Sequence, residues 1–452
     1  MVRRERHGRT EVTILIRRLA LACASLGLTG TLLIPAAPEA AAAGRAPERG
    51  IQSVTPITRV HTYGQKVEAV AVEYGAAVNP RTLDRGTFTV TDSIYNFRYN
   101  PIEDLDKYAD REVVRVYTNN KAGLRADGRS RAGRYVIVEL APTDPGGNTV
   151  IVSKCPTFLC SVKVNPDLPT KIVQNEAVHA APGRGKGRGP VLASASSTPR
   201  PLTEPAVNLL VDEFEQATYL RDGTVLPYAY HLPRSYDPRR SYPLMVILPG
   251  HGMGWDGDNL GVSLAADIPA TAWLTPQWTG KKEDVIVLVP QNQRVGSAAE
   301  AELMTGLVEE FMDSHAVDSR RVYASTVSYG STLAWEALAK KPGLFTAALV
   351  TGGFEVSAEQ AKGIAKAETP LWITHGLNDH LLPVRYGRDS TETLRDAYTA
   401  AGMDSERAED VIRYTEYGNE AFSEPDYHAA YGPTYEDPSI LRWLLRQKSG
   451  GE

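Results

Sequence analysis

Two continuous apolar runs in the second half of the chain constrain the fold more than any other feature. Residues 244–248 read Leu-Met-Val-Ile-Leu, and residues 285–289 read Val-Ile-Val-Leu-Val. Strands of this kind are buried on both faces, which is typical of a parallel sheet covered by helices. Further strand-like runs occur at 225–231, 322–325, 347–350, 371–374 and 411–414, and helix-forming segments at 301–312, 333–341 and 439–447. Residues 207–448 are therefore predicted to form a doubly wound α/β domain with a mostly parallel sheet.

The preceding segment, residues 51–175, has a different pattern. Short runs alternate apolar and polar residues, and Asn-Pro, Asp-Gly and Pro-Gly-Gly-Asn clusters separate them. The alternating runs are 67–74, 87–90, 113–117 and 134–140. Hairpin-like spacing with hardly any helical period predicts an all-β sandwich. The segment holds no evident catalytic group and is interpreted as a packing or binding module.

Residues 176–206 are rich in Gly, Pro, Ser and basic residues. A segment of this composition is typical of a flexible linker. We therefore expect a truncated chain that begins near Pro205 to keep its activity on small soluble substrates.

Residues 1–43 are predicted to be a cleaved signal peptide. A basic stretch precedes an apolar stretch from Leu19 to Pro35, and the Ala-rich end at 41–43 offers an A-x-A cleavage site. The apolar stretch is short and interrupted by glycine, which favours a signal peptide over a membrane anchor. Secretion and no stable membrane insertion are the expectations, and the choice between Sec and Tat export stays open.

Cysteine use and charge agree with a secreted protein that does not bind nucleic acid. Without Cys23, only Cys155 and Cys160 remain, five residues apart. We predict that they form a disulfide in an oxidising compartment, because no His or further Cys nearby completes a zinc site. The formal net charge is −5 and no basic face is evident, so nucleic acid is not an expected partner. The oligomeric state is not indicated.

The candidate nucleophile is Ser328, which stands between a strand-like run at 322–325 and a helix-forming run at 333–341. A strand, a serine and a helix in this order predict a nucleophile elbow, in which a sharp turn projects the hydroxyl out of the sheet. The usual pattern is G-x-S-x-G. Gly330 fits this pattern, but Thr326 occupies the place of the first glycine.

Two further residues complete a candidate triad in the chain order Ser, Asp, His. A serine hydroxyl needs a base, and the base needs a carboxylate to orient it. Asp379 follows the strand-like run at 371–374, and His428 lies in a loop after the run at 411–414. An aspartate or a loop histidine alone would mean little, but this order on these elements points to serine hydrolase chemistry.

The oxyanion-binding groups are expected in the Gly-rich loop after residues 244–248. The loop reads Pro-Gly-His-Gly-Met-Gly, and its glycines let backbone N–H groups approach a substrate oxygen. The N–H groups of His251 and Tyr329 are the candidates. A phosphate-binding loop is the rival interpretation, but the Lys-Ser/Thr ending of such loops is absent.

Residues from about Leu226 to Leu445 resemble the secreted esterase and polyhydroxybutyrate-depolymerase branch of the α/β-hydrolases. The matching motifs include Leu-Pro-Tyr at 226–228, Tyr-Pro-Leu at 242–244, Pro-Gln at 290–291, Arg-Val-Tyr at 321–323 and His-Gly at 375–376 with Asp379. Members of this branch often carry an N-terminal immunoglobulin-like domain. The resemblance implies an α/β-hydrolase fold, ester hydrolysis by Ser328, Asp379 and His428, and no metal or cofactor.

The chain departs from the family pattern at three positions. Thr326 and Ser331 replace glycines of the elbow, and Pro249 replaces the His of the usual His-Gly oxyanion turn. We predict a secreted serine esterase acting on small-molecule or polymeric esters. The alternatives are a serine peptidase of the prolyl-oligopeptidase type and a non-catalytic binding protein with a degenerate hydrolase fold.

Overall fold

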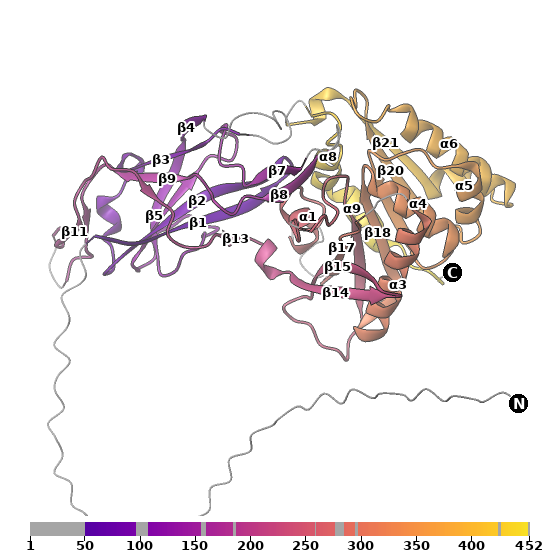
Figure 1. Ribbon diagram of the computed structural model, residues 1–452, viewed down its shortest axis with the longest axis horizontal. Helices are drawn as coiled ribbons and strands as arrows, with labels where there is room; N and C mark the ends of the chain where they lie inside the picture. The colour runs from indigo at the N-terminus through magenta and orange to yellow at the C-terminus, as the bar shows by residue number, and fades with distance from the viewer. Residues whose placement is uncertain are drawn as a thin grey trace, which may run out of the picture. The chain divides into compact units, whose positions relative to one another are not determined.

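The structure, a computed structural model, describes residues 50–95, 107–154, 160–183, 187–257, 259–275, 284–293, 297–423 and 426–450. Its contacts divide the chain into Met1–Ala46 and a second unit, Pro47–Glu452. The second unit contains a β-rich part and an α/β part (Figure 1). The predicted signal peptide, residues 1–43, lies outside the described residues. In the part of the chain that is described, no helix is long and apolar enough to span a membrane.

The β-rich part contains two main sheets. The first has the order β13 (Val207–Asn208), β1 (Ile51–His61), β2 (Gly64–Tyr74), β6 (Tyr135–Leu140) and β5 (Val113–Asn119). The second has the order β12 (Arg200–Pro201), β9 (Lys171–Gln174), β3 (Phe88–Ser93) and β4 (Tyr108–Arg111). The short helices η1 (Pro80–Thr82) and η2 (Arg85–Thr87) precede β3. Neighbouring strands are antiparallel except for the parallel pair β1 and β13.

Apolar side chains from both sheets form one core. Val72 of β2 and Val138 of β6 share a buried cluster with Val90 of β3 and Ile172 of β9. All four are at most 1% exposed. Alternation along the strands directs these side chains inward, so the two sheets pack face to face as a β-sandwich.

The segment 176–206 differs from the predicted flexible linker. It contains β10 (Val178–His179), β11 (Val191–Ala193) and β12, and β12 pairs with β9 of the sandwich. Leu192 is 3% exposed and belongs to the sandwich core. Composition predicted a linker because few of these residues are apolar. Backbone pairing and one buried leucine nevertheless make most of the segment part of the sandwich.

The α/β part is built on one eight-stranded sheet. Its order is β14 (Glu215–Arg221), β15 (Thr224–His231), β17 (Ile286–Pro290), β16 (Tyr242–Leu248), β18 (Val317–Val327), β19 (Ala347–Thr351), β20 (Leu371–Gly376) and β21 (Ile412–Tyr417). From β17 to β21 all neighbours are parallel, whereas β14–β15 and β15–β17 are antiparallel. Every residue of β16, β17 and β19 is buried, as the apolar runs predicted.

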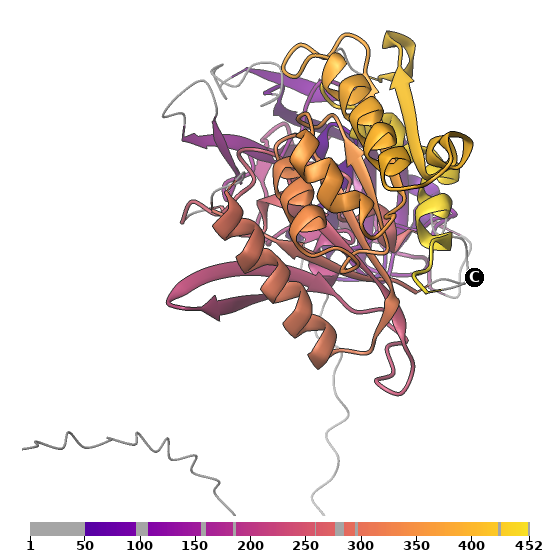
Figure 2. The same ribbon diagram turned by 90° about the vertical axis from the view of Figure 1, so that its right-hand side faces the viewer.

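Helices cover both faces of this sheet, and Figure 2 looks onto one of these helical layers. One face carries α3 (Ala298–Ser314), α4 (Gly330–Lys340), α5 (Ala358–Ala365), α6 (Arg385–Ala400) and α7 (Ser405–Val411). The other carries α1 (Val262–Ala265), α8 (Tyr431–Glu436) and α9 (Pro438–Arg446). Three further short helices are η3 (Val211–Glu213), η4 (Ala272–Leu274) and η5 (Asn419–Ala421). This arrangement is the α/β-hydrolase fold.

Candidate active site

Ser328 stands at the turn between β18 and α4 with a backbone φ of +50°. Positive φ is unfavourable for a residue with a side chain, and such strain concentrates at functional sites. The backbone N–H of Ser328 donates to the Thr351 carbonyl at 2.9 Å, which ties the turn to β19. The sharp turn therefore presents the hydroxyl beyond the end of the sheet, as in a nucleophile elbow.

Gly330 explains why one glycine of the elbow is required. A Cβ atom at this position would lie 2.7 Å from the Pro249 carbonyl oxygen and closer still to that of Leu248. The start of α4 thus packs directly against the end of β16. Thr326 is fully buried at the end of β18, so the first elbow position accommodates a β-branched residue.

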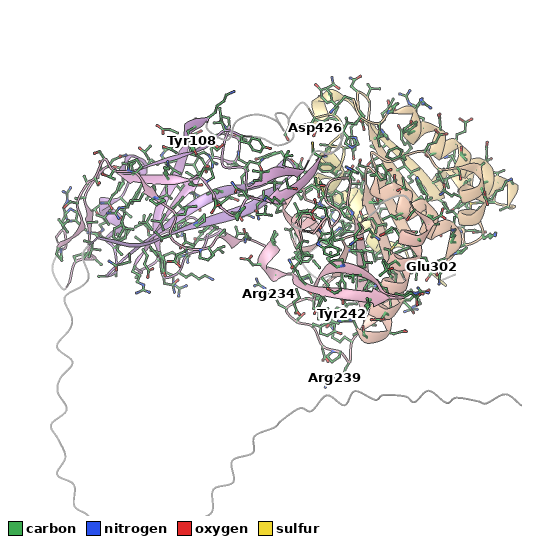
Figure 3. The ribbon with its side chains drawn as sticks, in the orientation of Figure 1. Tyr108, Arg234, Arg239, Tyr242, Glu302 and Asp426 are labelled. Atoms are coloured by element: carbon green, nitrogen blue, oxygen red, sulfur yellow. The ribbon has the colours of Figure 1, made fainter. Side chains whose placement is uncertain are left out.

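The structure brings Ser328, Asp379 and His428 into one hydrogen-bonded chain. His428 lies between β21 and α8, and its Nε2 is 2.8 Å from Ser328 Oγ. Its Nδ1 is 2.8 Å from Oδ2 of Asp379, which follows β20. Figure 3 marks Asp426, two residues before His428, at the opposite end of the sheet from Tyr242, where β16 begins. The three side chains therefore meet at the carboxyl ends of the parallel strands.

Asp379 is held in its ionised form. Its side chain is fully buried, and Oδ1 accepts the N–H groups of Leu381 and Leu382 at 2.9 and 2.8 Å. Burial raises the pKa of this carboxyl, but hydrogen bonds from His375 and His428 outweigh burial and hold the pKa well below its usual range. An ionised Asp379 accepts Nδ1–H of His428, which leaves Nε2 free to accept the Ser328 proton.

The two candidate oxyanion donors lie beside the nucleophile. Tyr329 follows Ser328 directly, and the rings of Tyr329 and His251 are 5.6 Å apart. A Cβ atom at Gly250, next to His251, would lie 3.5 Å from Ser328 Cβ. Within the described residues, neither the His251 nor the Tyr329 backbone N–H has a hydrogen-bond acceptor. Both can therefore bind an oxygen atom of a substrate.

A second histidine at the acid was not predicted from the sequence. His375, the last residue but one of β20, is fully buried, and its Nε2 lies 3.3 Å from Asp379 Oδ2 and 3.0 Å from the Leu382 carbonyl oxygen. The ring therefore fixes both ends of the turn that carries the carboxylate. The sequence places His375 four residues before Asp379, which was the one sign that the two side chains could meet. Spacing alone does not show that the His375 ring is buried against the carboxylate.

Ser331 also has a role that the sequence did not reveal. Its Oγ accepts the backbone N–H of Phe354 at 2.8 Å, and the Trp335 indole donates to the Phe354 carbonyl at 2.9 Å. These bonds fix Phe354 between Tyr329 and Tyr386, with ring centroids 5.0 and 6.1 Å apart. Replacement of the usual glycine by Ser331 thus orders an aromatic row that begins next to the nucleophile.

The remaining candidates fall partly outside the site. Cys160 precedes β8 (Ser161–Val164), whereas Cys155 lies outside the described residues, so the disulfide stays a prediction. Nowhere in the described ranges do three His, Cys, Asp or Glu side chains gather to hold a metal ion.

Comparison with known proteins agrees with both parts of the fold. Residues 53–185 match the family model described as the esterase Ig-like N-terminal domain. A solved structure described as a thermostable esterase is 26% identical, with a TM-score of 0.72 over 88% of this chain and 100% of that chain. No curated protein sequence matches the chain.

Two other solved structures match part of the chain. An esterase from Thermogutta terrifontis is 14% identical, with a TM-score of 0.36 over 54% of this chain and 96% of that chain. A lipase/esterase from Lactobacillus plantarum is 12% identical, with a TM-score of 0.33 over 45% of this chain and 91% of that chain.

Fold and comparisons together define the class of the protein. It is an α/β-hydrolase domain preceded by an immunoglobulin-like domain of the kind found in esterases. Over most of its length the chain has the same architecture as the thermostable esterase.

Proposed function

We propose that the protein is a secreted serine esterase in which Ser328, His428 and Asp379 form the catalytic triad. The single observation that carries the proposal is the continuous hydrogen-bonded chain from Ser328 Oγ through His428 to Asp379. Carboxylic ester hydrolysis is the chemistry of the class to which the two domains point.

The proposed reaction proceeds through an acyl-enzyme. Ser328 Oγ attacks the ester carbonyl carbon while its proton passes to His428 Nε2. The N–H groups of His251 and Tyr329 stabilise the resulting oxyanion. Collapse of the tetrahedral intermediate breaks the bond to the alcohol oxygen, which leaves with the proton from His428. Water then attacks the acyl-enzyme with His428 again as base, and the acid is released.

Two alternatives are less well supported. A peptidase of the prolyl-oligopeptidase type would use the same triad on amides, but the domain that precedes this hydrolase is of the esterase type. A non-catalytic binding protein would not need a strained serine in hydrogen-bond reach of a histidine–aspartate pair. The ester hydrolysed, small or polymeric, stays undefined.

Secretion is part of the proposal and rests on residues 1–43. Its test is N-terminal sequencing of the protein recovered from the culture medium. The recovered chain should begin after the Ala-rich segment at 40–43. Cell-associated protein with an intact N-terminus would reject export by this route.

The predicted disulfide has its own test. Mass measurement with and without reduction would show whether Cys155 and Cys160 are joined.

The triad is tested by labelling and by substitution. A fluorophosphonate should label Ser328 with one equivalent per chain, as shown by peptide mapping. Ser328→Ala should abolish labelling and lower ester hydrolysis by about 10⁴-fold or more, while unfolding stays cooperative. His428→Ala and Asp379→Asn should also lower kcat strongly. Ser357→Ala, at an exposed helix cap, is the matched control. Full activity of Ser328→Ala, or a label elsewhere, would reject the assignment.

A further inference from the structure

The sandwich contacts the hydrolase loop that carries the candidate oxyanion donor His251. A hairpin of the sandwich, β7 (Val150–Lys154) with β8, packs beside α1. The Val162 N–H of β8 donates to the carbonyl of Gly252 at 3.1 Å. Gly252 directly follows His251, so this hydrogen bond from the sandwich holds the neighbouring peptide.

Gly252 is shaped for this contact. Its φ is +82°, and a Cβ atom would overlap the carbonyl oxygen of Cys160 at the start of the hairpin strand. Only glycine combines this backbone conformation with so close an approach. The sandwich backbone therefore lies directly against the loop at the residue that follows His251.

An apolar cluster joins the same two segments. The sandwich contributes Tyr95, Val150 and Val162, and the hydrolase contributes Met253, Val262, Ala265 and Ala266. Each is at most 8% exposed. Met253 is the second residue after His251, so separation of the two parts would expose the side chain that anchors the loop.

A second contact reaches the segment that carries His428. Thr62, in the turn between β1 and β2, has its Cβ 3.5 Å from where a Cβ atom of Gly432 would lie. Thr62 and Tyr63 line a small open pocket of about 20 Å³ together with Phe422 and Ala429. A space of that size holds about one water molecule, so the turn lies close to residues that precede and follow His428 in the sequence.

We propose that the immunoglobulin-like domain is a positioning element of the active site, which fixes the oxyanion-binding loop through Val162 and Met253. This inference rests on the proposed esterase function. It replaces the expectation that a chain beginning near Pro205 is active, because removal of the sandwich would release the loop at Gly252 and leave Met253 in water. A displacement of a catalytic group by about 1 Å can cost about 10²-fold in rate.

The test compares two buried methionines in the full-length chain. Met253 and Met403 are each 8% exposed, but Met403 lies in the core beyond α6, away from the loop. We expect Met253→Ala to lower kcat on a short p-nitrophenyl ester by about 10-fold or more. It should weaken binding of an aryl trifluoromethyl ketone, whose adduct occupies the oxyanion site, by a similar factor. Met403→Ala should lower thermal stability and leave both quantities within about twofold.

A milder variant and a double-mutant cycle complete the test. Val162→Ala, on the sandwich side, should lower kcat in the same direction, and the double variant with Met253→Ala should be less than additive. Unchanged kcat and ketone affinity in folded Met253→Ala and Val162→Ala would overturn the inference. The esterase proposal itself is tested separately, by the activity of Ser328→Ala and by the site of the fluorophosphonate label, so the two failures are distinguishable.

Discussion

At the scale of single residues, two buried hydroxyl groups near the elbow have opposite surroundings. Ser331 and Thr326 are both fully buried and lie on either side of Ser328. Ser331 Oγ accepts the Phe354 N–H, whereas Thr326 Oγ1 has no partner among the described residues. A buried polar atom stabilises a protein only when it is hydrogen-bonded.

Removal of each hydroxyl should therefore change stability differently. Ser331→Ala leaves the partly buried N–H of Phe354 without an acceptor and should lower the free energy of unfolding by about 1–3 kcal/mol. Thr326→Val keeps the shape, removes an unpaired hydroxyl, and should be neutral or stabilising. Urea unfolding of both variants measures this difference. Equal losses would show that the Phe354 hydrogen bond contributes little.

At the scale of elements, the site depends on how closely α4 meets β16. Gly330 opens α4 and lies against the Leu248 and Pro249 carbonyls. Gly432 is the second residue of α8, also in a first helical turn, but a Cβ atom there would make only an ordinary contact with Thr62. Both glycines lie in the first turn of a helix, but only Gly432 has room for a Cβ atom.

Alanine at these two glycines should separate packing from helix propensity. Gly330→Ala must push α4 away from β16, which should lower both thermal stability and ester hydrolysis, the latter by about 10-fold or more. Gly432→Ala should be tolerated or slightly stabilising, because alanine favours a helix. Thermal unfolding and kcat/KM check both. A fully active Gly330→Ala would mean that the elbow adapts without cost.

At the scale of the whole molecule, lowering the pH should lower the free energy of unfolding through a buried histidine of the sandwich, His61. His61 ends β1, next to the turn that meets the His428 segment. Burial, reinforced by the charges of Lys66, Arg59 and Arg111, lowers the pKa of His61 to about 4. The unfolded chain therefore binds a proton at higher pH than the folded protein, and folding is disfavoured as pH falls from about 6.5 towards 4.

Replacement of His61 should flatten this dependence. For His61→Gln, the free energy of unfolding should fall less between pH 7 and pH 4 than for the unchanged protein. The difference should reach at most about 3 kcal/mol, which is the cost of a downward pKa shift of this size. Urea unfolding at several pH values provides the measurement. Parallel curves for the two proteins would show that His61 does not titrate with folding.

Local pattern was sufficient to predict much of the fold and to select candidate site residues that lie together in the structure. Continuous apolar runs predicted β16 and β17, because strands covered on both faces need apolar side chains throughout. Ser328, Asp379 and His428 follow the later strand-like runs at 322–325, 371–374 and 411–414, and the structure places His428 within hydrogen-bond distance of both other residues. Parallel strands bring their carboxyl ends to one edge, so order along the chain translated into proximity.

Elements without a clear apolar pattern were not predicted. The edge strand β14 and the polar helix α6 gave no strong signal, because each is half solvated. The strands in 176–206 were assigned to a linker, because backbone pairing leaves little trace in composition. These segments take their structure from partners far away in the chain.

The sequence by itself determined the α/β alternation, the strand–serine–helix turn and the order of the candidate triad. The first two can be read from residues that are neighbours in the chain. The third can be predicted because parallel strands bring the residues that follow them to the same edge of the sheet. Only the tertiary structure decided that His375 supports Asp379, that Ser331 holds Phe354, and that β8 meets Gly252. Each of these contacts joins segments whose proximity depends on packing, and no local pattern encodes it.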